Sequence, residues 1–173
     1  GFAQFVRVPK INVEQGVYRL PRGMSFEQGT FIEPLACVLR GQRLAAIGKT
    51  DTLLVIGCGV SGLLHLQLAK LKGAKRIIVA DVNPYRLSLA EKFGADVIIE
   101  AKENVPQKLK DANDGRLADQ VIVPGPLDLP RLDAHRVALE AHVRPQPRQD
   151  LPHELHVAQV RHAADDARLS RQQ

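Results

Sequence analysis

The sequence predicts an α/β protein containing one half of a doubly wound parallel sheet. Short apolar segments alternate with longer amphipathic ones between residues 52 and 123. Strands separated by helices of about 10 to 15 residues indicate right-handed βαβ units. A glycine-rich segment follows the first apolar run, and Asp81 ends the second. Together these observations predict a parallel sheet with polar groups gathered at the carboxyl ends of its strands.

Shorter elements are expected before residue 50. The β-branched residues of Val6–Val13 predict short strand segments. Ser25 and Gln28 have the spacing of a capping box, so a helix should begin there. Pro34 suits the first turn of a further helix, in which apolar residues recur at helical spacing up to Gly48.

The alternating region is predicted element by element from its apolar runs and its glycines. Because the strands are apolar throughout, both faces of the sheet should be covered. Gly73 and Gly94 should end the first two helices. The predicted strands are Leu53–Ile56, Ile77–Ala80, Val97–Ile99 and Val121–Val123, and the predicted helices are Leu63–Leu71, Pro84–Phe93 and Val105–Ala112.

The segment between the first strand and its helix reads G-x-G-x-x-G, a pattern that is informative in this context. Gly57 permits the tight turn, Gly59 lacks a Cβ that would hold a pyrophosphate away, and Gly62 lets the helix pack closely on the strand. The helix begins at Val60 and Ser61, where free backbone N–H groups and the helix dipole favour an anion. A diphosphate is the expected ligand.

Asp81 lies about 20 residues beyond this motif, where a carboxylate can accept hydrogen bonds from the adenosine ribose. It would repel a 2′-phosphate, so NAD is favoured over NADP, and Arg86 one helical turn later would soften that preference. The pattern predicts a dinucleotide-binding Rossmann fold. Two alternatives are a glycine turn without a ligand and a methyltransferase, whose glycine loop often follows an acidic residue that Leu53–Ile56 does not supply.

Thr30–Val38, which contains Glu33-Pro34, together with the glycine motif resembles the zinc-dependent medium-chain dehydrogenases of the alcohol dehydrogenase family, nearest the sorbitol and threonine dehydrogenase branch. The resemblance covers about residues 1–123. It implies a partial Rossmann fold preceded by the C-terminal remnant of a GroES-like catalytic domain. It also implies a homo-oligomeric parent enzyme that oxidises a small-molecule alcohol by hydride transfer to NAD, of which this chain is a fragment.

The resemblance further implies that Glu33 is a ligand of a catalytic zinc ion, which would act as a Lewis acid on the alcohol. The family's other ligands belong to an upstream segment, so the chain alone is expected to be inactive, and no residue is assigned a catalytic role. Cys37 is expected to be a small buried thiol. His65 is expected to be a helix histidine with satisfied hydrogen bonds, and Cys58 to do no chemistry.

The composition changes abruptly near Val123. Gly125 is the sole glycine after that point although the chain has 13, and Arg, His and Pro become frequent. We expect residues 1–48 to be the end of the catalytic domain with its connecting helix, residues 49–123 to be the NAD-binding half, and residues 124–173 to be an atypical tail. A GC-rich gene read out of frame would give such a composition. The tail is expected to be disordered or to form two short helices near Leu132–Leu139 and Leu155–Val160.

A competing interpretation is a non-catalytic nucleotide-binding or nucleic-acid-binding adaptor with a basic tail, since the net charge is +5. Aromatic residues make up only 4% of the chain and Trp is absent, which disfavours nucleic acid as a partner. The tail's histidines follow no ligand spacing. No apolar run approaches the roughly 20 residues that span a bilayer, and the cysteine pattern is typical of the cytoplasm.

Overall fold

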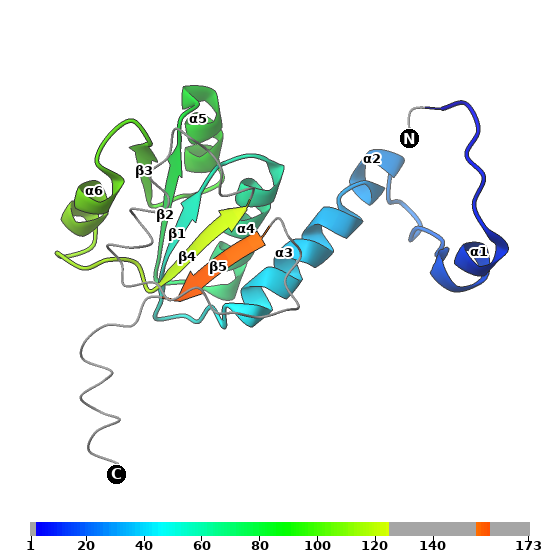
Figure 1. The fold of residues 1–173 in the computed structure, drawn as a ribbon, viewed down its shortest axis with the longest axis horizontal. Coiled ribbons are helices and arrows are strands. Elements are labelled where there is room, and N and C mark those ends of the chain that lie inside the picture. The colour runs from blue at the N-terminus through cyan, green and yellow to red at the C-terminus, as the bar shows by residue number, and fades with distance from the viewer. Residues whose placement is uncertain (1–2, 125–154, 160–173) are drawn as a thin grey trace, which may run out of the picture. The chain divides into compact units, whose positions relative to one another are not determined.

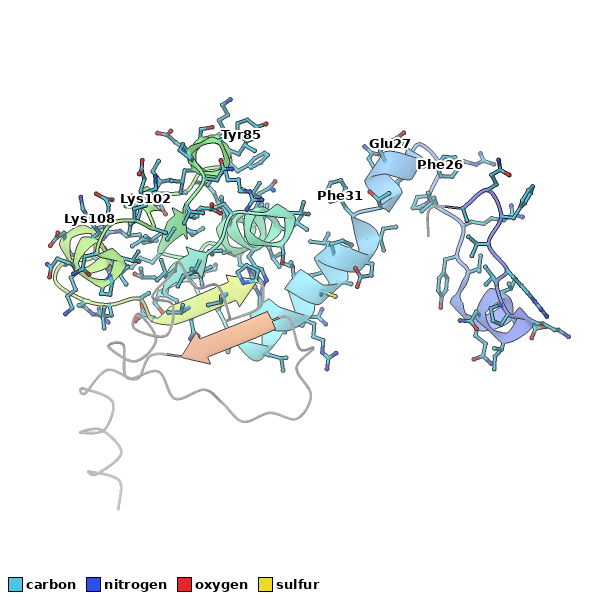
Figure 2. All side chains as sticks on the ribbon, turned by 45° about the horizontal axis from the view of Figure 1, so that its top comes forward. Phe26, Glu27, Phe31, Tyr85, Lys102 and Lys108 are labelled. Atoms are coloured by element: carbon cyan, nitrogen blue, oxygen red, sulfur yellow. The ribbon has the colours of Figure 1, made fainter. Side chains whose placement is uncertain are left out.

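A computed structural model describes residues 3–124 and 155–159, and the chain divides into two compact units, Gly1–Glu33 and Pro34–Gln173. The first unit contains α1 (Lys10–Gly16) and α2 (Phe26–Gly29), and α3 (Ile32–Leu44) begins at its end. No residue is buried within the described part of this unit, and Phe26 on α2 is 85% exposed (Figure 2).

The predicted capping box is confirmed. The Ser25 backbone N–H donates to Oε1 of Gln28 at 3.0 Å, and the Gln28 N–H donates to Oγ of Ser25 at 3.2 Å. The predicted strand over Val6–Val13 is wrong, because Ile11 and Val13 lie in α1. A strand needs a neighbour for its backbone hydrogen bonds, whereas a helix satisfies them locally, and no strand lies among the described residues of this unit.

The second unit is built on a sheet of order β3-β2-β1-β4-β5 (Figure 1). Its first four strands are parallel, which confirms the predicted α/β sheet. The strands are β1 (Thr52–Ile56), β2 (Arg76–Asp81), β3 (Val97–Glu100), β4 (Gln120–Pro124) and β5 (Leu155–Gln159), and the helices between them are α4 (Val60–Lys72), α5 (Pro84–Lys92) and α6 (Val105–Ala112).

Alternation along the strands gives the sheet two apolar faces. Leu54 and Ile78 belong to a buried cluster that includes Leu109 of α6. Leu53 and Val55 belong to a second cluster, which includes Leu66 of α4. The sheet is therefore covered on both faces, as predicted, although edge strand β3 is only partly buried and its Ile98 is 39% exposed.

The predicted helix over Leu155–Val160 is wrong, since Leu155–Gln159 forms strand β5. This strand pairs antiparallel with β4, so among the described residues the parallel part of the sheet ends at β4. The unpaired N–H and C=O groups along the edge of β4 favour a strand over an isolated helix. The other predictions for the tail concern residues 125–154 and 160–173, which lie outside the described residues.

No helix among the described residues is long and apolar enough to cross a membrane. Helix α3 is joined to α4 through Gln42, whose Nε2 donates to the backbone oxygen of His65 at 2.7 Å and lies 3.4 Å from Nδ1 of the same residue. Both side chains are fully buried, and burial lowers the pKa of His65 to about 4, with a smaller effect from the charge of Lys72. The expectation of a satisfied histidine holds for one ring nitrogen only, because Nε2 has no partner among the described residues.

His65 should make folding stability depend on pH. Its folded pKa lies below the unfolded value of 6.5, so its contribution is complete above pH 6.5 and is lost as the pH falls towards 4. Between pH 7 and pH 5 we expect a loss of about 2 kcal/mol in the free energy of unfolding. Urea titrations followed by circular dichroism should show this slope in the natural chain and a much flatter one in His65→Leu. Equal slopes in both proteins would contradict the assignment.

Candidate functional site

The glycine loop, Gly57–Gly62, connects β1 to α4 at the carboxyl end of β1. Gly57 has φ of 107°, a conformation that side chains disfavour, and its N–H donates to the Ala80 oxygen at 2.7 Å. Gly59 is the N-cap of α4 in an extended conformation. The loop between β1 and α4 is therefore a tight turn that is hydrogen-bonded to the neighbouring strand β2.

Gly62 and Gly59 differ in what a side chain would meet. A Cβ at Gly62 would lie 1.8 Å from the Gly57 backbone oxygen. Only glycine, which has no Cβ, avoids this steric clash. A Cβ at Gly59 would meet nothing within 4 Å. The predicted close packing at Gly62 is therefore confirmed, while the space beside Gly59 is open to a ligand.

The first turn of α4 offers hydrogen-bond donors to this space. The N–H groups of Val60, Ser61 and Gly62 have no intrahelical acceptor, because they precede the first helical hydrogen bond, from Leu63 to Gly59. They have no other acceptor among the described residues. Gly59 supplies no side-chain cap, so these donors and the positive end of the helix dipole are available to an anion.

Asp81 ends β2 beside the glycine loop and is only 3% exposed. Its Oδ2 accepts the backbone N–H of Cys58 at 2.6 Å, and its Oδ1 accepts the N–H of Asn83 at 2.8 Å. An ionised carboxylate has about four acceptor sites, so roughly two remain for further donors. Asp81 therefore joins the loop after β1 to the loop after β2, a role that its position in the sequence did not reveal.

The start of α5 completes the surroundings of Asp81. Asn83 caps this helix by accepting the N–H groups of Tyr85 and Arg86 at 2.9 and 3.3 Å. Arg86 Nη1 lies 3.9 Å from Asp81 Oδ2, and its side chain is 52% exposed. Tyr85 is 69% exposed on the outside of the helix (Figure 2). The sequence interpretation missed Asn83, although an Asn followed by Pro84 is a recognisable helix start.

Cys58 is buried, and its Sγ lies 4.0 Å from the Ala80 oxygen. Burial, and then the negative charge of Asp81, raise the pKa of this thiol to about 12, against a smaller lowering by Arg86. Since the thiolate is the reactive form, the raised pKa disfavours reaction of Cys58 at neutral pH.

Glu33 and Cys37 both lie on α3, and both are exposed. The expectation that Cys37 is buried is wrong, since the buried residues of α3 are Val38, Gly41 and Gln42. Among the described residues, no three His, Cys, Asp or Glu side chains are grouped so that they could hold a metal ion. These residues therefore do not by themselves fit a catalytic zinc ion.

Part of the chain is similar to known dehydrogenases. Residues 61–125 match the family model described as zinc-binding dehydrogenase. Sorbitol dehydrogenase of Ovis aries is 36% identical over 103 residues, which are 60% of this chain and 29% of that protein. The structure of galactitol-1-phosphate dehydrogenase from Escherichia coli has a TM-score of 0.63 and 30% identity, over 81% of this chain and 38% of the other.

A short-chain alcohol dehydrogenase from Escherichia coli CFT073, solved in complex with NADH, has a TM-score of 0.52 and 28% identity, over 59% of this chain and 30% of that one. The matched segments are small parts of the relatives. The chain spans less than a third of the length of the sorbitol dehydrogenase that it matches.

The two glycines should respond differently to substitution. Gly62→Ala should lower the free energy of unfolding by about 1 to 3 kcal/mol, because the loop must move away from the new Cβ. Gly59→Ser should be neutral or stabilising, since its side chain enters open space and serine is a good N-cap. Urea unfolding of both variants measures the difference. A destabilisation by Gly59→Ser as large as that by Gly62→Ala would contradict the geometry.

Proposed function

We propose, from the match of residues 61–125 to the zinc-binding dehydrogenase family model, that this chain is the cofactor-binding part of an alcohol or polyol dehydrogenase and binds NAD. The observation that carries the proposal is the open cradle at the start of α4. There, the first N–H groups of the helix have no acceptor among the described residues, and a Cβ at Gly59 would meet nothing within 4 Å. These features suit the diphosphate of a dinucleotide.

In this proposal the amides of Val60, Ser61 and Gly62 donate to the diphosphate, and Gly57 fixes the turn that presents them. The helix dipole adds a favourable interaction with the negative charge. Gly59 allows the phosphate oxygens to approach the backbone, since a larger residue would occupy their volume. The loop is held in place before any ligand arrives, because the Gly57 and Cys58 N–H groups are bonded to β2.

Asp81 is proposed to accept the adenosine ribose hydroxyls through the acceptor sites that Cys58 and Asn83 leave open. A 2′-phosphate at this place would meet a buried carboxylate, so NAD should bind more tightly than NADP. Arg86 lies close enough to offset part of that repulsion. The E. coli CFT073 relative carries NADH, which supports this choice of cofactor.

Bound NAD⁺ would accept a hydride from the alcohol carbon, giving NADH, a carbonyl product and a proton. The described residues of this chain hold and orient the cofactor, and none of them is assigned to the reacting atoms. The relatives named above act on sorbitol and galactitol 1-phosphate, which supports a polyol as the substrate class. A cytoplasmic, homo-oligomeric parent enzyme is part of the same proposal, and both cysteines are outside any disulfide, as that location favours.

The resemblance to dehydrogenases also underlies the proposed division of the chain into domains. Residues 1–48 are proposed to be the end of a GroES-like catalytic domain with its connecting helix, residues 49–123 the NAD-binding half and residues 124–173 an atypical tail. Glu33 is proposed as a single zinc ligand, to be completed by ligands from the segment that the relatives carry beyond the matched region. Its exposure on α3 is compatible with that role.

Replacement of Asp81 should weaken the binding of NAD⁺. Asp81→Asn keeps the size of the side chain but replaces an acceptor oxygen with a donor, so we expect an affinity about 10-fold to 100-fold lower and a smaller preference over NADP⁺. Titration calorimetry measures both. The matched control is Asp96→Asn, because Asp96 Oδ2 accepts the Ile77 N–H at 2.7 Å at the other end of β2. Similar losses in both variants would show that Asp81 only supports the loop.

Glu33 should affect bound zinc only when the remaining ligands are supplied. A chimera joining the preceding segment of sheep sorbitol dehydrogenase to this chain should hold stoichiometric zinc, measured by mass spectrometry of the metal after dialysis. Glu33→Gln should remove most of that zinc, whereas Glu14→Gln, which alters an exposed residue paired with Lys10 on α1, should not. Full zinc occupancy in the Glu33→Gln chimera would refute the ligand assignment.

A further inference from the structure

The link between α3 and α4 is made by Gln42 and His65, two polar side chains that are fully buried. The Gln42 amide nitrogen donates to the His65 backbone oxygen at 2.7 Å and lies 3.4 Å from Nδ1 of the same residue. An amide nitrogen carries two hydrogens, so it donates to both acceptors when Nδ1 is unprotonated. The link therefore selects the neutral form of His65 whose proton is on Nε2.

A protonated His65 fits neither orientation of the Gln42 amide. In the orientation of the structure, the N–H of Nδ1 would face the Gln42 amide nitrogen, which is also a donor. With the amide turned over, Gln42 Oε1 would accept from Nδ1 but would lie against the His65 backbone oxygen, which is also an acceptor. Protonation therefore removes one of the two hydrogen bonds between the helices in either case.

The charges around His65 oppose a proton on its ring while the helices stay together. Burial lowers the pKa of His65 most, and the charge of Lys72 on the same helix lowers it further. Strands β1 and β4, which contact α4, contain no ionisable side chain. The ionisable residues of the other elements in contact with α4 are Arg40 and Arg43 of α3, Arg76 and Asp81 of β2, and Tyr85, Arg86, Glu91 and Lys92 of α5.

Helix α3 is held by few buried residues. Of its 13 residues, the buried ones are Val38, Gly41 and Gln42, and only Val38 has a large apolar side chain. Strands β1 and β2 are instead buried along almost their whole length. A segment with few buried apolar contacts opens at a lower free-energy cost than the core strands do. The hydrogen bonds of Gln42 are therefore a large part of what holds α3 against α4.

From this geometry we propose that the link between Gln42 and His65 is a pH-sensitive switch, in which protonation of His65 separates α3 from α4 while the parallel sheet stays folded. In this open form, water reaches Gln42 Oε1 and His65 Nε2, two buried atoms that have no partner among the described residues. The inference is independent of the proposed function, because neither side chain belongs to the glycine loop or contacts Asp81.

Hydrogen exchange of the full 173-residue chain at pH 7 and pH 5, corrected for the intrinsic pH dependence of amide exchange, tests the proposal. The pKa of His65 is about 4 with the helices in contact and 6.5 once the ring is hydrated, so the link is strongest above pH 6.5 and weakens towards pH 4. Opening of α3 should increase about 20-fold between pH 7 and pH 5. At both pH values, the amides of β1 and β2 should exchange more slowly than those of α3.

Equal protection of α3 and β1 at both pH values would overturn the inference, because His65 would then gain its proton only when the whole sheet unfolds. His65→Leu removes the titrating ring, so α3 should open equally at pH 7 and pH 5 in this variant. A 20-fold response retained in His65→Leu would assign the titration to another group and would also overturn the inference.

A pair of glutamine variants tests the link without changing the histidine. Gln42→Leu should increase the opening of α3 at pH 7 about tenfold, the effect of roughly one lost hydrogen bond. The matched control is Gln67→Leu, because Gln67 Nε2 donates to the Leu63 oxygen at 3.2 Å within α4. This control should open like the natural chain and keep the 20-fold response to pH. Equal opening of α3 in the two variants would show that Gln42 does not hold the helix and would refute the switch.

Discussion

The close approach of Gly62 to the backbone oxygen of Gly57 is the constraint on which the site depends. A Cβ at Gly62 would lie 1.8 Å from that oxygen, so the helix can begin directly against the turn only with glycine at this position. The approach keeps the first turn of α4 at the carboxyl end of β1, where Leu66 belongs to the same buried cluster as Leu53 and Val55.

Asp81 links this arrangement to the next βα connection. By accepting the N–H groups of Cys58 and Asn83, its carboxylate fixes the glycine loop and the start of the β2–α5 connection at once. A test of the proposed contact between Asp81 and the ribose must therefore control for the part that Asp81 plays in the geometry of the loop.

The sequence was sufficient for β1 to β4 and the helices between them because each is determined locally. Continuous apolar runs require a sheet that is covered on both faces. Gly73 and Gly94, which were predicted to end α4 and α5, do so with positive φ. Prediction failed where tertiary context decides. The β-branched residues near Ile11 have no neighbouring strand among the described residues and form α1. The segment that begins at Leu155 pairs with the otherwise unpaired edge of β4 and forms a strand. The predicted burial of Cys37 failed because the buried residues of α3 begin one position later, at Val38.

For the site, sequence spacing identified Gly57, Gly62 and Asp81 as a group. It could not show that the Asp81 carboxylate accepts hydrogen bonds from two backbone N–H groups. The polarity of β5 was equally hidden, because pairing between Pro124 and Leu155 joins residues far apart in the chain. Half of a doubly wound sheet leaves β4, a strand of mostly buried residues, with an exposed edge, and unpaired backbone groups on such an edge invite association with other chains. An antiparallel strand satisfies those groups as completely as a parallel one does. The same pairing, however, places the amino end of β5, rather than its carboxyl end, beside the carboxyl end of β4.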